Sequence, residues 1–197
     1  MNKKKISGPA LFMYVVIFVT VITAAVCFGL YYGNKSESDA VLWIGIVAFM
    51  IVYHFWGRIL MGNVSKWFKL NHNHWWFKER SFEKGLYKLL LVKKWKGKAL
   101  TYNPESFSLN VHSLDEIVAV MTKSEVDHWI NEIISLCSIL FSLLWGELWI
   151  FIITAVCAMI FDAQFIVIQR FNRPRLLNIL EKQRLQSKAK CCTQYEA

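Results

Sequence analysis

The sequence predicts an all-α polytopic membrane protein with about four transmembrane helices, a structured interfacial loop and amphipathic helices. Two observations predict this class. The chain of 197 residues is 55% hydrophobic, and its apolar residues gather in long runs separated by short polar or strongly basic segments. At a rise of about 1.5 Å per residue, each run is long enough to cross the roughly 30 Å hydrocarbon core of a bilayer. We therefore expect a single membrane-embedded domain over residues 1–197.

The predicted spans cover about residues 10–32, 40–61, 128–145 and 148–169. The first run exceeds the apolar core of about 7 to 15 residues in a cleaved signal peptide, so we expect a retained helix. The third run is the shortest, and it follows the polar stretch SEVDHWINEI, which begins at Ser124. The 5 cysteines indicate no disulfide framework, because three lie in spans and two in a tail where thiols stay reduced.

Positive charge predicts the orientation of these spans. The chain carries 23 Lys and Arg residues against 14 Asp and Glu residues. Of these cations, 11 lie between Gly62 and Ser124 and 7 follow Gln169, while Lys3 to Lys5 precede the first span. Short loops that keep Lys and Arg on the cytoplasmic side determine topology. Both termini, the interfacial loop of residues 62–127 and the tail of residues 170–197 should therefore face the cytoplasm.

The interfacial loop is too long and too regularly patterned for a linker. From Trp67 to Lys98 it alternates aromatic and cationic residues, a pattern typical of a segment in the lipid headgroup layer. One helical face is marked by Phe82, Leu86, Leu89 and Leu90. Because this basic band lies between spans, we expect it to contact the bilayer and no nucleic acid. Ser113 and Glu116 then have capping-box spacing, which predicts a short amphipathic helix.

The polar stretch at the start of the third span is the first candidate site. Positions three and four apart share a helix face, so Glu125, His128 and either Asn131 or Glu132 should line up. A histidine oriented by a carboxylate is a general base, and its ordinary pKa of about 6.5 suits proton transfer at neutral pH. The alternative is a polar helix end with an anchoring Trp129, which requires no chemistry.

The histidines do not form a recognisable metal motif. A di-iron site needs a second Glu-x-x-His, and the sequence holds one copy. The zinc pattern His-Glu-x-x-His is also absent. His72 and His74 form an H-x-H pair, which is more often a polar loop than a metal site. We therefore expect no metal and no resident cofactor.

A second candidate site lies at the end of the fourth span, in the sequence IQRFNRPRLLNIL. Its polar residues are Gln169, Arg170, Asn172, Arg173 and Arg175. Stop-transfer arginines explain one or two of these cations without any function. Three arginines around an Asn-x-Pro turn can also hold a phosphate or a developing oxyanion through forked hydrogen bonds. Pro174 is predicted to break the span before an amphipathic helix.

Polar residues within the spans form a third set. His54 and Arg58 lie one helical turn apart near the end of the second span, and polar residues in a span usually face the bundle interior. His54 is therefore a rival to His128 as the general base. Asp162, within the fourth span, is costly unless it is paired.

Three stretches in order resemble the glycosyl-4,4'-diaponeurosporenoate acyltransferase family, bacterial membrane enzymes that acylate a glycosylated carotenoid. They are LVKKWKGK (Leu91 to Lys98), EVDHW (Glu125 to Trp129) and IQRFNRPRL (Ile168 to Leu176). The resemblance covers roughly Trp75 to Leu180. The resemblance implies a bacterial acyltransferase in the cell membrane, with acyl-CoA as its co-substrate. The implied partners are the bilayer and an acceptor that is a glycolipid or a glycosyl carotenoid.

The resemblance and the residues together predict a mechanism of direct acyl transfer, without a covalent acyl-enzyme. The candidate catalytic residues are His128, Glu125, Asn172 and Arg173. The candidate substrate-binding residues are Trp95, Lys96, Trp129, Asn131, Gln169, Arg170, Arg175, His54 and Arg58. We expect Glu125 to orient His128, and Arg170, Arg173 or Arg175 with Asn172 to stabilise the oxyanion or hold donor phosphates. The lysines expected to attract the CoA moiety are Lys93, Lys94, Lys96 and Lys98.

Two other classes of protein fit the same residues. A membrane methyltransferase of the isoprenylcysteine type also joins a short helical bundle to a cytoplasmic end rich in His, Arg and Asn. A non-catalytic protein that recognises anionic lipid would need only the charges. Cofactor binding separates the first class from an acyltransferase, and charge-preserving substitutions separate the second.

Overall fold

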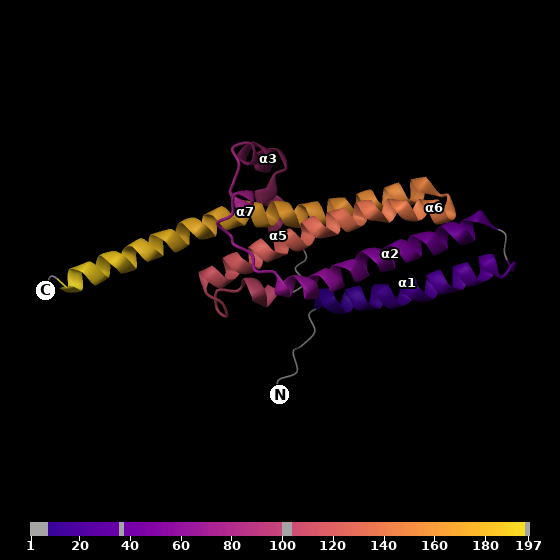
Figure 1. Cartoon of the computed structure of the whole chain (residues 1–197), viewed down its shortest axis with the longest axis horizontal. Coiled ribbons are helices and arrows are strands. Elements are labelled where there is room, and N and C mark those ends of the chain that lie inside the picture. Colours follow the sequence, from indigo (N-terminus) through magenta and orange to yellow (C-terminus); the bar gives the residue numbers. More distant parts are fainter. Residues whose placement is uncertain (1–7, 36–37, 100–103, 196–197) are drawn as a thin grey trace, which may run out of the picture. The chain divides into compact units, whose positions relative to one another are not determined.

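A computed structural model describes residues 8–35, 38–99 and 104–195 of the chain (Figure 1). Within these ranges the chain folds entirely into helices and connecting turns, with no strand. Four helices are long and apolar enough to cross a membrane, which confirms the predicted fold class. The α-helices are α1 (Gly8–Tyr32), α2 (Asp39–Val64), α3 (Glu83–Leu89), α4 (Val92–Trp95), α5 (Leu114–Cys137), α6 (Ser142–Trp145) and α7 (Leu148–Tyr195).

The helices pack into two compact units. In the described part of the chain, unit 1 contains α1, α2, α6, residues 127–137 of α5 and residues 148–164 of α7. Unit 2 contains residues 69–99, residues 104–126 and the rest of α7. The two long helices α5 and α7 therefore contribute residues to both units.

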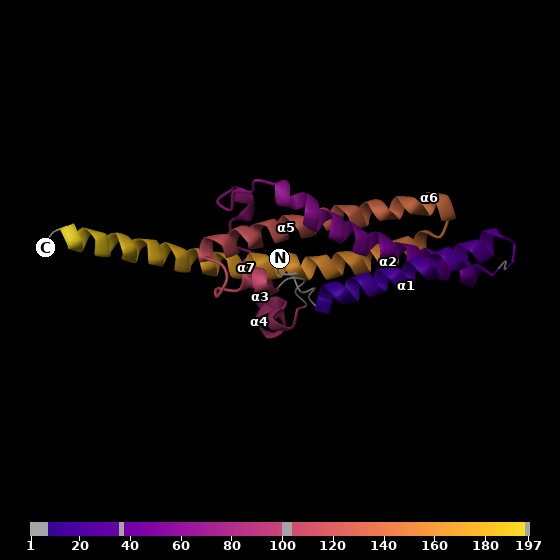
Figure 2. The ribbon, with the colours of Figure 1, turned by 90° about the horizontal axis from the view of Figure 1, so that it is seen from below.

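Unit 1 is a bundle of apolar helices. Helices α1 and α2 run side by side in both views (Figures 1 and 2). They approach closely at Gly45, where an added Cβ atom would lie 3.1 Å from the Cβ atom of Cys27. The buried core contains Leu42, Ile46, Met50, Ile150 and Phe151. Many large side chains of α1 stay exposed, including Phe18 at 67%, as expected for a helix that faces lipid.

The third predicted span is part of a longer helix. The amphipathic stretch and the apolar stretch form one helix, α5, from Leu114 onward, so residue 128 is not a helix boundary. The predicted capping box at its start is confirmed, because the Ser113 amide donates to Glu116 Oε2 at 2.8 Å and the Glu116 amide donates to Ser113 Oγ at 3.3 Å. After η5 (Ser138–Phe141) and α6, Gly146 adopts a φ of 78° and turns the chain into α7.

Pro174 does not end the fourth span, so that prediction was wrong. Helix α7 continues through Pro174 from Leu148 to Tyr195. A proline inside a helix removes one backbone hydrogen bond, to the carbonyl of Arg170, and costs about 3 kcal/mol. The side chains of Arg170 and Arg173 are held by carboxylates in unit 2, which keeps this turn helical and offsets the lost bond.

Unit 2 places residues 69–99 of the interfacial loop against the second half of α7. Its buried core contains Tyr87, Val92 and Phe171, with Trp95 and Val167 packed against them. The rings of Tyr87 and Phe171 meet edge to face, with centroids 5.3 Å apart. The face predicted for lipid contact is exposed at all four positions: Phe82, Leu86, Leu89 and Leu90.

Candidate active site

Unit 1 contains a buried polar cluster centred on Asp162. We call it the His128 cluster, and it consists of His54, Arg58, His128, Ser135 and Asp162. The Asp162 side chain is 0% exposed. Its Oδ1 atom lies 2.7 Å from Nδ1 of His128, and its Oδ2 atom accepts a hydrogen bond from Arg58 Nη2. A carboxylate within an apolar bundle is costly unless it is paired, and both of its oxygens have partners here.

The Arg58 guanidinium is held from several sides. Its Nη1 atom donates to the backbone carbonyl of His54 at 3.0 Å, and its Nη2 atom donates to that of Ala158 at 3.2 Å. The guanidinium carbon also lies 5.1 Å from the centre of the Phe161 ring. These contacts immobilise the cation beside Asp162, so Arg58 fixes the position of the carboxylate that meets His128.

Several polar atoms of unit 1 have no partner among the residues that the structure describes. Nδ1 of His54 lies 3.4 Å from Ser135 Oγ, but Nε2 of His54 is buried without a hydrogen bond. Asn131 is 5% exposed, and its Oδ1 atom is also buried without a hydrogen bond in the described residues. Buried polar atoms without partners are rare in proteins, and a bound molecule with hydroxyl groups would satisfy them.

The pair of His128 and Asp162 is suited to proton transfer. A carboxylate that accepts the proton on Nδ1 selects the tautomer in which the lone pair lies on Nε2, and it stabilises the imidazolium that forms when Nε2 takes a proton. The predicted partner of His128 was Glu125, three residues earlier in α5. The structure corrects this pairing, because the carboxylate on His128 is Asp162 and Glu125 is bound by arginines.

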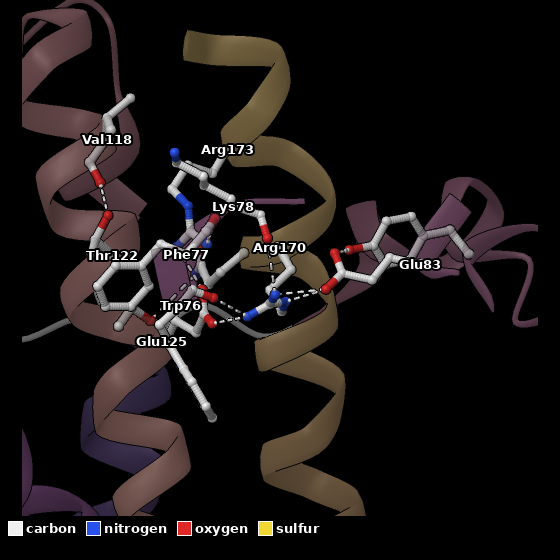
Figure 3. A network of polar contacts seen from close by, with 12 residues as sticks. Trp76, Phe77, Lys78, Glu83, Val118, Thr122, Glu125, Arg170 and Arg173 are labelled. Carbon is white, nitrogen blue, oxygen red and sulfur yellow. Dashed lines mark hydrogen bonds and ion pairs between the residues drawn. The ribbon is translucent and has the colours of Figure 1, made fainter. Parts of the chain in front are cut away.

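Glu125 belongs to a second buried network, in unit 2, which we call the arginine network. It consists of Glu83, Glu125, Arg170 and Arg173. Figure 3 shows Arg170 extending from α7 between Glu125 on α5 and Glu83 on α3. Nη1 of Arg170 donates to Glu125 Oε1 at 2.7 Å, and Nη2 donates to Glu83 Oε1 at 2.6 Å. Nη1 of Arg173 binds the other Glu125 oxygen.

Backbone carbonyls and a tyrosine complete the arginine network. Arg173 Nη2 donates to the Phe77 carbonyl at 2.8 Å, and Arg170 Nη1 donates to the Trp76 carbonyl at 3.2 Å. The Tyr87 hydroxyl donates to Glu83 Oε2 at 2.8 Å, and burial followed by this bond raises the pKa of Tyr87. Arg173 is 1% exposed. Two guanidinium charges thus meet two carboxylate charges in a buried site, which favours a structural role.

The remaining predicted residues of unit 2 gather around Phe171. Lys96 Nζ donates to Asn172 Oδ1 at 2.6 Å, and the Arg175 guanidinium stacks on the Phe171 ring with its carbon 3.9 Å from the ring centre. Trp95 holds this segment in place by donating its indole N–H to the Leu90 carbonyl at 2.8 Å.

Other predicted positions have simpler surroundings. Gln169 is buried and donates to Ser124 Oγ at 3.3 Å. Trp129 is 39% exposed on α5. His74 caps η2 (Trp75–Phe77) by accepting a bond from the Trp76 amide at 3.3 Å. In the described part of the chain, no three His, Cys, Asp or Glu side chains gather as a metal site would require.

Three residues of these networks were not among the predicted site residues: Glu83, Ser135 and Asp162. The sequence marks Asp162 as a charge that needs a partner, but it does not say which partner. Glu83 carries no signal, because it is one acid among many cations in the interfacial loop. Both pairings join residues far apart in sequence, with a separation of 34 positions for His128 and Asp162 and 87 positions for Glu83 and Arg170.

The described residues form an all-α protein with helices long and apolar enough to cross a membrane and with a buried contact between a histidine and a carboxylate. Residues 73–182, more than half of the chain, match the family of glycosyl-4,4'-diaponeurosporenoate acyltransferases, and the chain belongs to this family. The match confirms the resemblance expected over Trp75 to Leu180, and it makes the chain a member of an acyltransferase family. No curated protein and no solved structure matches the chain.

Proposed function

We propose that this chain transfers a fatty acyl group from acyl-CoA to a hydroxyl group of a glycosylated lipid or carotenoid, with His128 as the general base. The observation that carries this proposal is the 2.7 Å contact between His128 Nδ1 and Asp162 Oδ1. The family supplies acyl transfer as the reaction class, and its name specifies a glycosyl carotenoid acid as the acceptor.

The proposed reaction is a direct displacement. Nε2 of His128 takes the proton of the acceptor hydroxyl as the oxygen attacks the thioester carbonyl carbon. The carbon–sulfur bond then breaks, the CoA thiolate leaves, and the imidazolium returns its proton to the sulfur. Asp162 holds the imidazole in the required tautomer and stabilises the imidazolium, and Arg58 holds Asp162.

In this proposal, two buried polar atoms of unit 1 bind the acceptor by hydrogen bonds. Nε2 of His54 and Oδ1 of Asn131 are buried hydrogen-bonding atoms without a partner in the described residues, and a sugar presents hydroxyl groups that fit both. This assignment makes His54 a binding residue and His128 the base. In the rival assignment His54 is the base and His128 binds the acceptor, and the test described below distinguishes these two assignments.

The arginines of unit 2 divide into two roles in this proposal. Arg170 and Arg173 are positioning residues, because their guanidiniums are engaged by Glu83 and Glu125. Arg175, with Lys96 and Asn172, binds the donor. We further propose that both termini and the interfacial loop face the cytoplasm, since the positive charges gather there and acyl-CoA is a cytoplasmic compound.

The test compares the lipids and pigments of cells that express the wild type, His128→Ala or His54→Gln at matched membrane levels. Mass spectrometry should show an added fatty-acyl mass on a glycolipid or glycosyl carotenoid in the wild type. His128→Ala should abolish it, by about 10²- to 10⁴-fold. His54→Gln should lower it less, because the change keeps a polar side chain of similar length.

Two outcomes would contradict the proposal. An unchanged product level in His128→Ala, together with its loss in His54→Gln, would make His54 the base. No added acyl mass in a host that makes glycosyl carotenoids would favour a lipid-binding protein or a methyltransferase, and binding of S-adenosylmethionine would identify the latter.

A further inference from the structure

Two segments that lie far apart in sequence meet around the Phe171 ring in unit 2. The short helix α4 and the following turn η3 (Lys96–Lys98) bring Lys96 to the helix α7. On α7, Phe171, Asn172 and Arg175 lie within about one helical turn of one another. Lys96 Nζ lies 4.8 Å from the centre of the Phe171 ring, and the Arg175 guanidinium carbon lies 3.9 Å from it. One aromatic ring therefore contacts two cations.

The backbone holds these two cations in a defined place. Leu91 has a φ of 50°, which turns the chain sharply into α4. Val92 is 0% exposed in the core with Phe171, and the Trp95 indole is bonded to the Leu90 carbonyl. The position of Lys96 is thus set by the packing of the residues that directly precede it.

In the described part of the chain, no carboxylate forms an ion pair with this cluster. Among the residues that the structure describes, the ion pairs of unit 2 use Glu79, Glu83, Asp115, Glu116 and Glu125, and none of these pairs includes Lys93, Lys96 or Arg175. The polar partner of Lys96 is the neutral Asn172, whose amide carries further N–H donors. Like charges held close together in a partly buried site repel each other, and a bound anion would relieve this repulsion.

The titration of Lys96 is consistent with the same geometry. Burial, followed by the charges of Arg175 and Lys93, lowers the pKa of Lys96. The groups that face its ammonium are Lys93 on α4 and Phe171, Asn172 and Arg175 on α7, and none of them is acidic.

We infer that Lys96, Asn172 and Arg175 form a binding site for a phosphate group with more than one negative charge. This inference rests on the proposed function for its preferred source of phosphate, the nucleotide part of the acyl-CoA donor. A planar guanidinium and an ammonium beside an amide suit phosphate oxygens, which accept several charge-assisted hydrogen bonds at once. An anionic lipid headgroup offers the same chemistry, so the test includes both sources.

The first arm measures binding of coenzyme A itself to the purified full chain in discs of phosphatidylcholine. Lys96→Gln and Arg175→Gln should each weaken binding by about tenfold or more, the range of a hydrogen bond to a charged group. Lys182→Gln is the matched control, since Lys182 is an exposed cation on α7, the helix that carries Arg175. Omission of the 3′-phosphate of coenzyme A should weaken wild-type binding and leave the two variants less affected.

The second arm uses discs that contain phosphatidylglycerol and counts bound lipid by native mass spectrometry. If the site takes headgroups, Lys96→Gln and Arg175→Gln should each lose bound phosphatidylglycerol while coenzyme A affinity stays equal to that of Lys182→Gln. Either loss supports the phosphate site and names its source. Binding by both variants that equals that of Lys182→Gln in both arms would overturn the phosphate site.

The binding arms are independent of turnover. His128→Ala should bind coenzyme A as the wild type does, so a phosphate site is detectable even if acyl transfer fails. Circular dichroism of Lys96→Gln and Arg175→Gln should match the wild type, and Lys96→Arg, which keeps the charge, should retain most of the binding. Loss of binding in Lys96→Arg equal to that in Lys96→Gln would contradict a role for the charge.

Discussion

The His128 cluster of unit 1 and the arginine network of unit 2 are both buried and both contain carboxylates, but their polar atoms are paired differently. In the arginine network all four oxygens of Glu83 and Glu125 accept bonds, from Arg170, Arg173 or Tyr87. In the His128 cluster one oxygen of Asp162 pairs with the Arg58 guanidinium and the other with the His128 imidazole. Each network also holds a buried nitrogen without a partner in the described residues, Nε2 of His54 in one and Nε of Arg173 in the other.

Under the proposed function, this difference between an imidazole partner and a guanidinium partner separates a reactive network from a structural one. A guanidinium stays charged at any physiological pH, so its pairing with carboxylates does not change during a reaction. An imidazole gains and loses a proton near neutral pH, and its pairing with a carboxylate favours that exchange. We therefore expect substitutions in the His128 cluster to affect turnover first and substitutions in the arginine network to affect stability first.

The largest effect should follow Asp162→Asn. The change keeps the shape of the side chain but removes the charge that orients His128, so turnover should fall by about 10²- to 10⁴-fold, the contribution of a positioned base. Steady-state assays with the purified chain in lipid discs should show the loss in kcat, with KM for the acyl donor little changed.

Asp162→Glu provides the matched control for this prediction, because it keeps the carboxylate and should recover part of kcat. A rise in KM with unchanged kcat would instead assign Asp162 to binding. An equal loss in Asp162→Glu and Asp162→Asn, accompanied by unfolding, would make Asp162 a structural residue and remove the contrast between the two regions.

The next effect in size should follow Arg173→Ala. The change leaves one oxygen of the buried Glu125 and the Phe77 carbonyl without their donor, and breaking a buried ion pair costs about 3–5 kcal/mol. Denaturant titration of the purified chain in mixed micelles should show this loss in the free energy of unfolding.

The control for Arg173→Ala is Arg184→Ala. Arg184 pairs with Asp115 at 2.7 Å, but both side chains are more than half exposed, at 63% and 52%. An exposed pair contributes about 0–1 kcal/mol, so this variant should stay close to the wild type. Wild-type stability in Arg173→Ala together with lost turnover would place the arginine network in the chemistry.

The smallest effect should follow Tyr87→Phe. The change removes one donor to the buried Glu83, and the free energy of unfolding should fall by about 1–3 kcal/mol at neutral pH. Because the pKa of Tyr87 is raised in the fold, its contribution is fully present below about pH 10, the ordinary value for tyrosine, and is lost as pH rises above it.

Unfolding titrations at several pH values check this prediction. The difference in stability between the wild type and Tyr87→Phe should be constant between neutral pH and about pH 9 and should shrink above about pH 10. A difference that grows with alkaline pH would contradict the raised pKa and the hydrogen bond to Glu83.

Local patterns in the sequence were sufficient for much of the fold. The apolar runs predicted helices long enough to cross a membrane, and the spacing of Ser113 and Glu116 predicted the start of α5. Pro174 shows where local rules fail. The rule describes an isolated helix, whereas in unit 2 the arginines on the preceding turn are anchored to other elements, and tertiary contacts outweigh the local cost.

For the candidate site too, some features could be predicted from local sequence and others depended on tertiary contacts. The residue types available for chemistry were readable from the sequence, including His128, Glu125 and the arginines from Arg170 to Arg175, and the order of three motifs indicated the family. The pairing of these residues depended on how the helices pack. Glu125 and His128 are three positions apart on α5, yet they have different partners on α7. Glu125 pairs with Arg170 and Arg173, whereas His128 contacts Asp162. A buried charge takes the partner that its neighbouring helices bring within hydrogen-bonding distance, and helix packing does not follow from spacing along one helix.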